Sequence, residues 1–299
     1  MLVWASAFAG IRAALQDYSP FHLAVSRFLV SSCLLVLLAF FNRIRLPERA
    51  DLPRILLTGF FGIAAYNAAL NYGEMTVTAG AASFIVNTVP IFTTLLSLFF
   101  LREQVNLFGW FGMIVSFAGV SLIAIGESGG LQLGTGAIAL LCAALFLGLY
   151  SVLQKPLLAK YGAFNVVCYA IWTGTIGMFV FLPGLTQQIK AASVSSTLAV
   201  IYLGVFPSTV GYLCWSYVLS QMPASKAAVY LYLIPATAIV IAFVWLKEIP
   251  SWMSLVGGCI ALCGVVIVNI LGKPQPNKPL DQRQTDCLIK TAPVKPGVG

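Results

Sequence analysis

The chain has 299 residues, of which 60% are hydrophobic and only 9% are charged. A soluble domain carries about 25% charged residues, so this sequence lacks the polar surface that a water-soluble particle needs. The net charge of +8 does not indicate a nucleic-acid partner, because the basic residues lie in loops and near the C-terminus rather than on one stripe. Composition therefore predicts an all-α, polytopic membrane protein whose surroundings are lipid.

The residues that soluble enzymes use are scarce. The chain has one histidine, His22, and seven cysteines without a C-x-x-C pair. It contains no H-E-x-x-H, G-x-S-x-G or Walker A pattern. We therefore expect no enzymatic activity, no cofactor and no metal site, and we interpret the cysteines as small apolar packing residues.

Apolar runs of about 20 residues are long enough to cross a bilayer. Short loops connect most of these runs, as expected for antiparallel neighbours. The ten predicted spans are residues 1–16, 20–41, 52–72, 78–100, 107–126, 135–155, 164–182, 197–219, 224–246 and 252–271. The first run is short for a span, and residues 272–299, with five prolines, are predicted to form a disordered polar tail.

Basic residues in short loops indicate which side of the membrane faces the cytoplasm. With the N-terminus inside, only Lys190 and Lys247 fall in outside loops. The inside loops then hold Arg43, Arg45, Arg49, Arg54, Arg102, Lys155, Lys160 and Lys226. This asymmetry predicts that both termini lie in the cytoplasm.

The chain matches itself at an offset of 145 residues. Pro90 meets Pro235, and Leu101-Arg102-Glu103 meets Leu246-Lys247-Glu248. Glycines at 59, 112 and 119 likewise meet glycines at 204, 257 and 264. Residues 1–126 and 135–271 are thus predicted to be two repeats of five helices each. Because five is odd, the second repeat enters the membrane from the opposite side, an architecture typical of secondary transporters.

The order of these motifs resembles the drug/metabolite transporter superfamily, in particular the ten-helix EamA-type exporters of amino acids and aromatic metabolites. The resemblance rests on Trp4-Ala5-Ser6-Ala7-Phe8, Arg27-Phe28, Pro90-Ile91-Phe92 and the repeated motifs given above. The chain departs from it where that family usually has glycine, at Ala5, Arg102 and Lys247. The resemblance implies alternating access around a central cavity lined by spans 1, 3, 4, 6, 8 and 9.

Uncharged polar and aromatic side chains inside the spans are the candidates for lining this cavity. Polar groups in lipid need partners, so they should face the bundle interior, either at the cavity or in interhelical hydrogen bonds. The candidates include the repeat mates Asn67 and Tyr212, Asn71 and Ser216, and Asn87 and Tyr232. Tyr66, Tyr150 and Trp4 could add aromatic walls.

Two prolines and three cations complete the candidate set. Pro90 and Pro235 each break a helical hydrogen-bond ladder, which allows either a gating hinge or a static kink. Arg27, two turns into span 2, is a possible contact for a substrate carboxylate or phosphate, or it pairs with a carbonyl or a helix end. Arg12 and Lys155 are expected to extend to the membrane interface.

Acidic residues are expected only outside the membrane interior. Asp17, Glu74 and Glu127 are assigned to loops, and Glu103 and Glu248 are expected to cap the next helix and to pair with their basic neighbours. Without a carboxylate inside the membrane, facilitated movement is favoured over proton coupling. The small faces at Gly112, Ser116 and Gly119 and at Gly257, Ala261 and Gly264 suit close helix packing, which includes packing of the two spans on each other.

Together these features predict a transporter of small organic solutes, most simply neutral or aromatic amino acids and related metabolites. It is expected to work as a monomer or a weak homo-oligomer. A carrier of phosphorylated or nucleotide-sugar metabolites is the alternative within transport, and it requires basic groups such as Arg27 and Lys226 at the cavity. A non-transporting membrane receptor is the alternative from another class.

Overall fold

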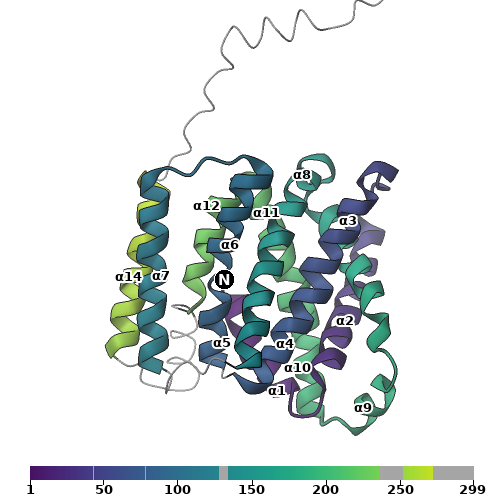
Figure 1. Cartoon of the computed structure of the whole chain (residues 1–299). Coiled ribbons are helices and arrows are strands. Elements are labelled where there is room, and N and C mark those ends of the chain that lie inside the picture. The colour runs from purple at the N-terminus through teal and green to yellow at the C-terminus, as the bar shows by residue number, and fades with distance from the viewer. Residues whose placement is uncertain (43, 78, 128–133, 236, 238–251, 272–299) are drawn as a thin grey trace, which may run out of the picture.

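The structure is a computed structural model that describes residues 1–42, 44–77, 79–127, 134–235, 237 and 252–271. Throughout this part of the chain the secondary structure is helical, with turns between helices (Figure 1). The helices of the first repeat are α1 (Leu2–Ala14), α2 (Pro20–Phe41), α3 (Leu52–Gly59), α4 (Tyr66–Thr76), α5 (Ala79–Val86), α6 (Val89–Leu96) and α7 (Leu107–Glu127). Those of the second are α8 (Thr135–Gly177), α9 (Leu185–Ala191), α10 (Val194–Val205), α11 (Tyr212–Gln221), α12 (Ala224–Val229) and α14 (Trp252–Leu271).

The described helices match the predicted spans apart from the ninth, which is described only in part, and two boundaries differ. The third span extends over Arg49–Thr76, four residues beyond its predicted end. The sixth and seventh spans run together as α8, with a kink at Gly162, whose φ of 76° is open to glycine because it lacks a Cβ. The ninth span is described only at residues 224–235 and 237, and the predicted tail, 272–299, lies outside the described residues.

The described helices combine into apolar stretches, several of which are long enough to cross a bilayer. Five stretches in the described part of the chain meet that length on composition, namely Pro20–Phe41, Arg49–Thr76, Ala82–Leu101, Thr135–Phe181 and Val194–Gln221. Leu2–Ala14, Leu107–Leu122 and Leu255–Val268 are shorter apolar helices. The all-α, polytopic membrane fold that the sequence predicts is confirmed.

The repeats share a departure from regular helix geometry. Spans 3 and 8 each contain a π-helical segment, Phe60–Ala65 between α3 and α4, and Phe206–Gly211 between α10 and α11. The offset between the two segments is close to the 145 residues of the internal repeat. The wider turns of each π-helical segment free backbone hydrogen-bonding groups near the middle of the span. Segments of this kind often mark functional sites.

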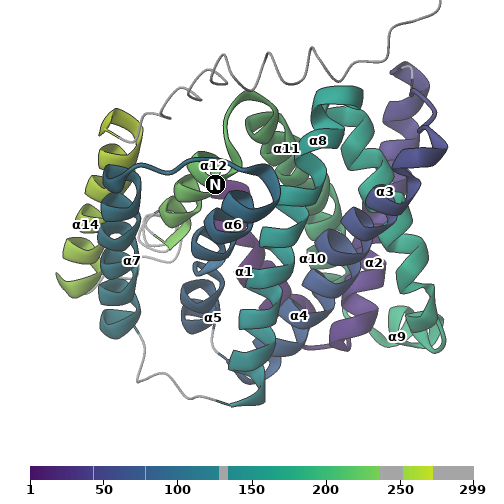
Figure 2. The same cartoon turned by 45° about the horizontal axis from the view of Figure 1, so that its top comes forward.

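Helices α7 and α14 form a pair at one edge of the bundle (Figures 1 and 2). Ser116 donates a 3.1 Å hydrogen bond to the carbonyl of Ala261, its own repeat mate. Gly119 packs on the backbone of Ala261 and Gly257, where a Cβ would overlap main-chain atoms. The small faces therefore pack on each other, as their sequences allow, and the pair stands outside the central bundle.

Candidate substrate cavity

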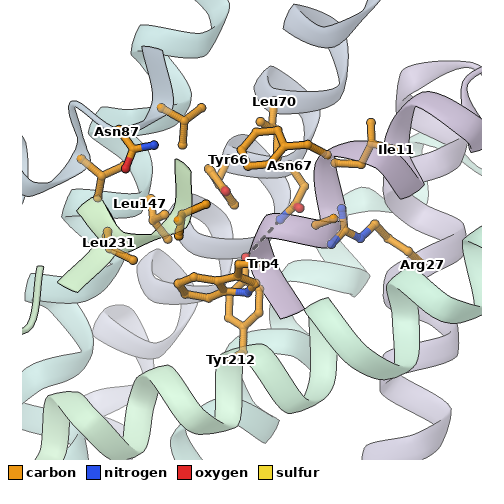
Figure 3. A pocket seen from close by; sticks show the side chains of 15 residues that line it. Trp4, Ile11, Arg27, Tyr66, Asn67, Leu70, Asn87, Leu147, Tyr212 and Leu231 are labelled. Carbon is orange, nitrogen blue, oxygen red and sulfur yellow. Dashed lines mark hydrogen bonds between the residues drawn. The ribbon is translucent and has the colours of Figure 1, made fainter. Parts of the chain in front are cut away.

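A cavity lies among the central helices (Figure 3). The cavity volume is about 40 Å³, which is room for a few water molecules. An organic solute therefore fits only if side chains move. Its wall is mostly apolar and comes from spans 1, 2, 3, 4, 6, 8 and 9. The lining residues are Trp4, Ala7, Phe8, Ile11, Arg27, Tyr66, Asn67, Leu70, Val86, Asn87, Val89, Leu147, Tyr212, Leu231 and Ile234.

Two repeat mates meet in the cavity wall. Asn67 Nδ2 donates to the Tyr212 hydroxyl at 3.3 Å and to the Ile63 carbonyl at 2.9 Å. The Tyr212 hydroxyl in turn donates to the Gly62 carbonyl at 2.9 Å. The carbonyl acceptors belong to the π-helical segment of span 3, so the irregular backbone orients both side chains. Contact between mates is expected of inverted repeats whose symmetry axis passes through the site.

Aromatic rings form one side of the cavity. Trp4 packs against Tyr212 with ring centroids 5.9 Å apart and against Trp215 at 5.6 Å. Its indole N–H donates to the Pro207 carbonyl at 3.2 Å, in the π-helical segment of span 8. Gly211 provides the space, since a Cβ there would lie 2.5 Å from Trp4 Nε1. This wall suits the faces and edges of apolar or aromatic solutes.

Arg27 is the cation of the cavity within the described residues. It is 3% exposed, and its Nε donates to Ser208 Oγ at 2.9 Å. Its Nη1 is buried and has no hydrogen-bond partner among the described residues. The guanidinium also lies 5.4 Å from the Phe28 ring centroid. A buried guanidinium with a free donor is suited to a carboxylate or phosphate oxygen.

The fourth span is broken where it meets the cavity. Helix α5 ends at Val86, Asn87 and Thr88 form a turn, and Pro90 lies in the first turn of α6. That position suits proline, because its missing N–H would have no partner there. Asn87 Nδ2 donates to the Ser83 carbonyl at 2.6 Å, and its Oδ1 is without a partner in the described part of the chain.

The ninth span departs from α-geometry at the equivalent place. After α12, residues Tyr230–Tyr232 form a 3-10 turn, and the buried Pro235 follows three residues later. Both prolines therefore accompany an irregular stretch at cavity depth. Whether these stretches act as hinges stays a prediction.

Four other candidates are buried but do not line this cavity. Tyr150 and Ser216 share a network in which Ser216 Oγ donates to Gln154 Oε1 at 2.7 Å. Asn71 donates to the Pro20 carbonyl at 3.0 Å, which ties α4 to α2. Tyr232 lies in a separate apolar cluster with residues of α7 and α14. In this conformation they support the wall rather than form it, and substrate binding by them stays a prediction.

The sequence-based placement of Glu74 in a loop was wrong. Glu74 lies within α4 and is 0% exposed. Helical neighbours four residues apart share a face, and Glu74 follows Leu70 of the cavity wall by four residues. That spacing is the sequence signal that could have placed Glu74 inside the bundle. A membrane-spanning stretch, Arg49–Thr76, therefore does contain a buried carboxylate, near its C-terminal end.

Glu103 caps a helix, but not the one that follows it in the chain. Its carboxylate accepts the backbone N–H groups of Ala224 at 2.7 Å and Ser225 at 2.9 Å. The Ser225 hydroxyl donates to it at 2.6 Å. The cap therefore joins the end of span 4 to the start of span 9, across the two repeats. Arg102 does not form an ion pair with it within the described residues, and Glu248 lies outside them.

Arg12 and Lys155 cap helix C-termini instead of reaching only for the interface. Arg12 Nη1 donates to the Glu74 carbonyl at 3.1 Å, near the end of α4. Lys155 Nζ donates to the carbonyls of Leu219 and Met222, at the end of α11. Glu74 and Leu219 are repeat mates, so the two cations perform the same function at opposite ends of the protein.

Lys226 lies away from the central cavity. It lines a smaller pocket between α12, α7 and α14, together with Gln104, Asn106 and Val268. The central cavity thus contains a single basic side chain, Arg27, among the described residues. A phosphorylated or nucleotide-sugar solute, which brings two or more negative charges, has little compensation there.

Comparison with known proteins agrees with this architecture. The profile of the EamA-like transporter family matches twice, at residues 1–125 and 134–270. The chain belongs to the EamA-like transporter family. It is therefore a membrane transporter of the drug/metabolite type, as its motifs indicated, and its relatives in this family are described as transporters rather than enzymes.

Two bacterial relatives match nearly the whole chain. An uncharacterized transporter, YdfC of Bacillus subtilis, is 44% identical over 263 residues, covering 88% of this chain and 86% of the relative. A probable terminal-alkyne amino-acid exporter of Streptantibioticus cattleyicolor is 38% identical over 269 residues, covering 90% of each. A crystal structure at 18% identity superposes with a TM-score of 0.73 over 91% of this chain and 94% of that one, which supports the fold alone.

Proposed function

We propose that this EamA-family transporter exports or facilitates the movement of neutral or aromatic amino acids and related metabolites. The observation that carries the proposal is the free Nη1 of Arg27 in the wall of an otherwise apolar and aromatic cavity. One guanidinium can pair with one carboxylate, while the aromatic wall receives an apolar side chain. An amino acid has both features.

The relative from Streptantibioticus cattleyicolor supports the same substrate class, because its printed name is that of an amino-acid exporter. Arg27 can compensate one negative charge, which favours amino acids over phosphorylated solutes. The predicted inverted repeats favour transport over a receptor function. We place the protein in the bacterial inner membrane with both termini in the cytoplasm, as a monomer or a weak homo-oligomer.

Alternating access is the proposed mechanism, with the cavity closed around the solute in turn from each side. The narrow cavity supports this, since a solute enters only if the wall moves. The broken span at Asn87 and the 3-10 turn at Tyr230–Tyr232 supply candidate bending points near Pro90 and Pro235. Glu103 and Lys155 would close the cytoplasmic side, and Arg12 would close the opposite side.

Counterflow in proteoliposomes tests the proposal. Vesicles loaded with an unlabelled solute should accumulate the same labelled solute faster than protein-free vesicles. The panel comprises L-phenylalanine, L-leucine, a nucleotide sugar and a sugar phosphate. We expect exchange of the amino acids, lost in Arg27→Gln and retained in Arg54→Gln, whose arginine is exposed. Exchange of only the phosphorylated solutes would favour the alternative carrier, and exchange of none would overturn transport of these solutes.

A further inference from the structure

Glu74 is a buried carboxylate that no described group neutralises directly. Both of its carboxylate oxygens are buried, and neither has a hydrogen-bond partner among the described residues. It lies one helical turn beyond Leu70 and two beyond Asn67, both in the cavity wall. In this position the carboxyl group continues the cavity-facing side of α4 toward its C-terminus.

The charged groups that act on Glu74 are two arginines. Arg12 comes from α1 and spends one donor on the Glu74 main-chain carbonyl, and Arg27 comes from α2. Neither guanidinium lies within ion-pair distance of the carboxylate in the described structure. Where α8 packs on this end of α4 it presents Gly136 and Leu140, and α5 has no ionisable side chain.

This arrangement suits a carboxyl group that carries a proton. A buried carboxylate without donors is costly, whereas its neutral form tolerates an apolar site. With Glu74 neutral, the positive charge of Arg27 is available to a solute. With Glu74 ionised, its charge competes for Arg27 through the same desolvated region, in which charges interact strongly.

We propose that Glu74 binds a proton together with each solute whose carboxylate binds at Arg27, so that proton and solute move in the same direction. The proposal rests on the proposed function, since it takes Arg27 as the carboxylate contact. The proton adds to a Glu74 carboxylate oxygen on the side where the solute enters, and it leaves on the side where the solute dissociates. No other bond is formed or broken.

Reciprocity between the two sites makes the proposal measurable. If protonation of Glu74 strengthens solute binding, then solute binding must draw a proton to the protein. Affinity for L-phenylalanine should therefore fall as pH rises, with a slope that approaches about tenfold per pH unit once Glu74 is ionised in the free protein. Titration calorimetry of the full chain in two buffers of different ionisation enthalpy measures the proton taken up.

The variant Glu74→Gln mimics the protonated form. We expect it to bind L-phenylalanine at every pH as the wild type does at low pH, and to take up no proton. Glu48→Gln, at an exposed glutamate that pairs with Lys160, is the matched control and should behave as the wild type. Should Glu74→Gln fail to fold, calorimetry of the wild-type protein still decides whether solute binding draws a proton to the protein.

Flux under a pH gradient separates this inference from the proposed function. Acid on the side that the labelled solute leaves should accelerate wild-type transport, and Glu74→Gln should exchange solute without responding to the gradient. Exchange that ignores the gradient, responds in the opposite direction or follows a sodium gradient instead would overturn the proton at Glu74 and leave amino-acid transport intact. Absence of any exchange in the wild type would overturn both.

Discussion

Asn67 and Tyr212 occupy the same position in the two repeats, and they are hydrogen-bonded to each other at 3.3 Å. A pair of mates in contact marks the place where one half of the protein meets the other. Ser116 and Ala261 repeat this relationship in the α7–α14 pair. Two independent contacts at the same offset support the predicted 145-residue repeat.

A double-mutant cycle on Asn67→Ala and Tyr212→Phe should reveal this contact. We expect a coupling of about 0.6 kcal/mol in thermal or denaturant unfolding in detergent, which is typical of polar pairs inside membrane proteins. Asn71→Ala, whose amide bonds to the Pro20 carbonyl instead, supplies the control cycle with Tyr212→Phe. Additive effects of Asn67→Ala and Tyr212→Phe would contradict direct contact.

Glu103→Gln should weaken the junction between spans 4 and 9. The native carboxylate accepts two backbone N–H groups and one hydroxyl at the start of α12, and a neutral amide supplies one oxygen and no negative charge. We expect a loss of about 1 to 2 kcal/mol in unfolding free energy. Ser225→Ala, which removes one of the three bonds, should cost less. Equal stability of Glu103→Gln and wild type would argue against the cap.

Arg12→Gln and Lys155→Gln should change the balance between the two closed states in opposite directions. Each cation holds the C-terminus of one helix, α4 for Arg12 and α11 for Lys155, and the two helices are repeat mates at opposite ends. Cysteine accessibility to a membrane-impermeant reagent, measured in right-side-out and in inside-out vesicles, should rise on the side of the substituted cation. A rise on the same side in both variants would contradict their mirrored placement.

Arg102→Gly should stabilise the protein. Arg102 has a φ of 53°, in the left-handed region where a side chain costs about 1 kcal/mol and glycine does not. Glycine is the residue that the family resemblance leads one to expect at this position. Arg102→Ala keeps the Cβ and removes the charge, so its melting temperature should stay at or below that of the wild type. Stabilisation by both variants would trace the effect to charge instead of backbone strain.

Gly119→Ala should loosen the α7–α14 pair. A Cβ at this position would overlap the backbone of Ala261, and overpacking of this kind costs about 1 to 3 kcal/mol. Gly177→Ala is the matched control, because a Cβ there meets nothing within 4 Å. We expect a lower melting temperature for Gly119→Ala alone. Equal behaviour of the two variants would contradict close packing of the pair.

Sequence alone determined the class and the family, and it predicts the repeat. Each follows from features that do not depend on detailed packing: the scarcity of charge excludes a soluble particle, and apolar runs have the length of a bilayer. Motifs such as Pro90 and Pro235 stay aligned because both repeats meet the same geometric needs. The two small faces, at Gly119 and Gly264, were likewise readable, since only small residues allow helices to approach so closely.

Tertiary structure decided which polar groups share a site. Spacing placed Asn67 and Asn71 on one face, but only Asn67 reaches the cavity, because Asn71 lies one turn farther along α4 and its amide bonds to the Pro20 carbonyl of α2. Glu103 caps a helix that begins 121 residues away in the sequence. No local sequence pattern predicts a contact between residues so far apart. Glu74 looked like a loop residue because its charge ended the apolar run. Folding buries it against α1, α2 and α8, and whether a charge faces water or the protein interior depends on contacts between distant helices.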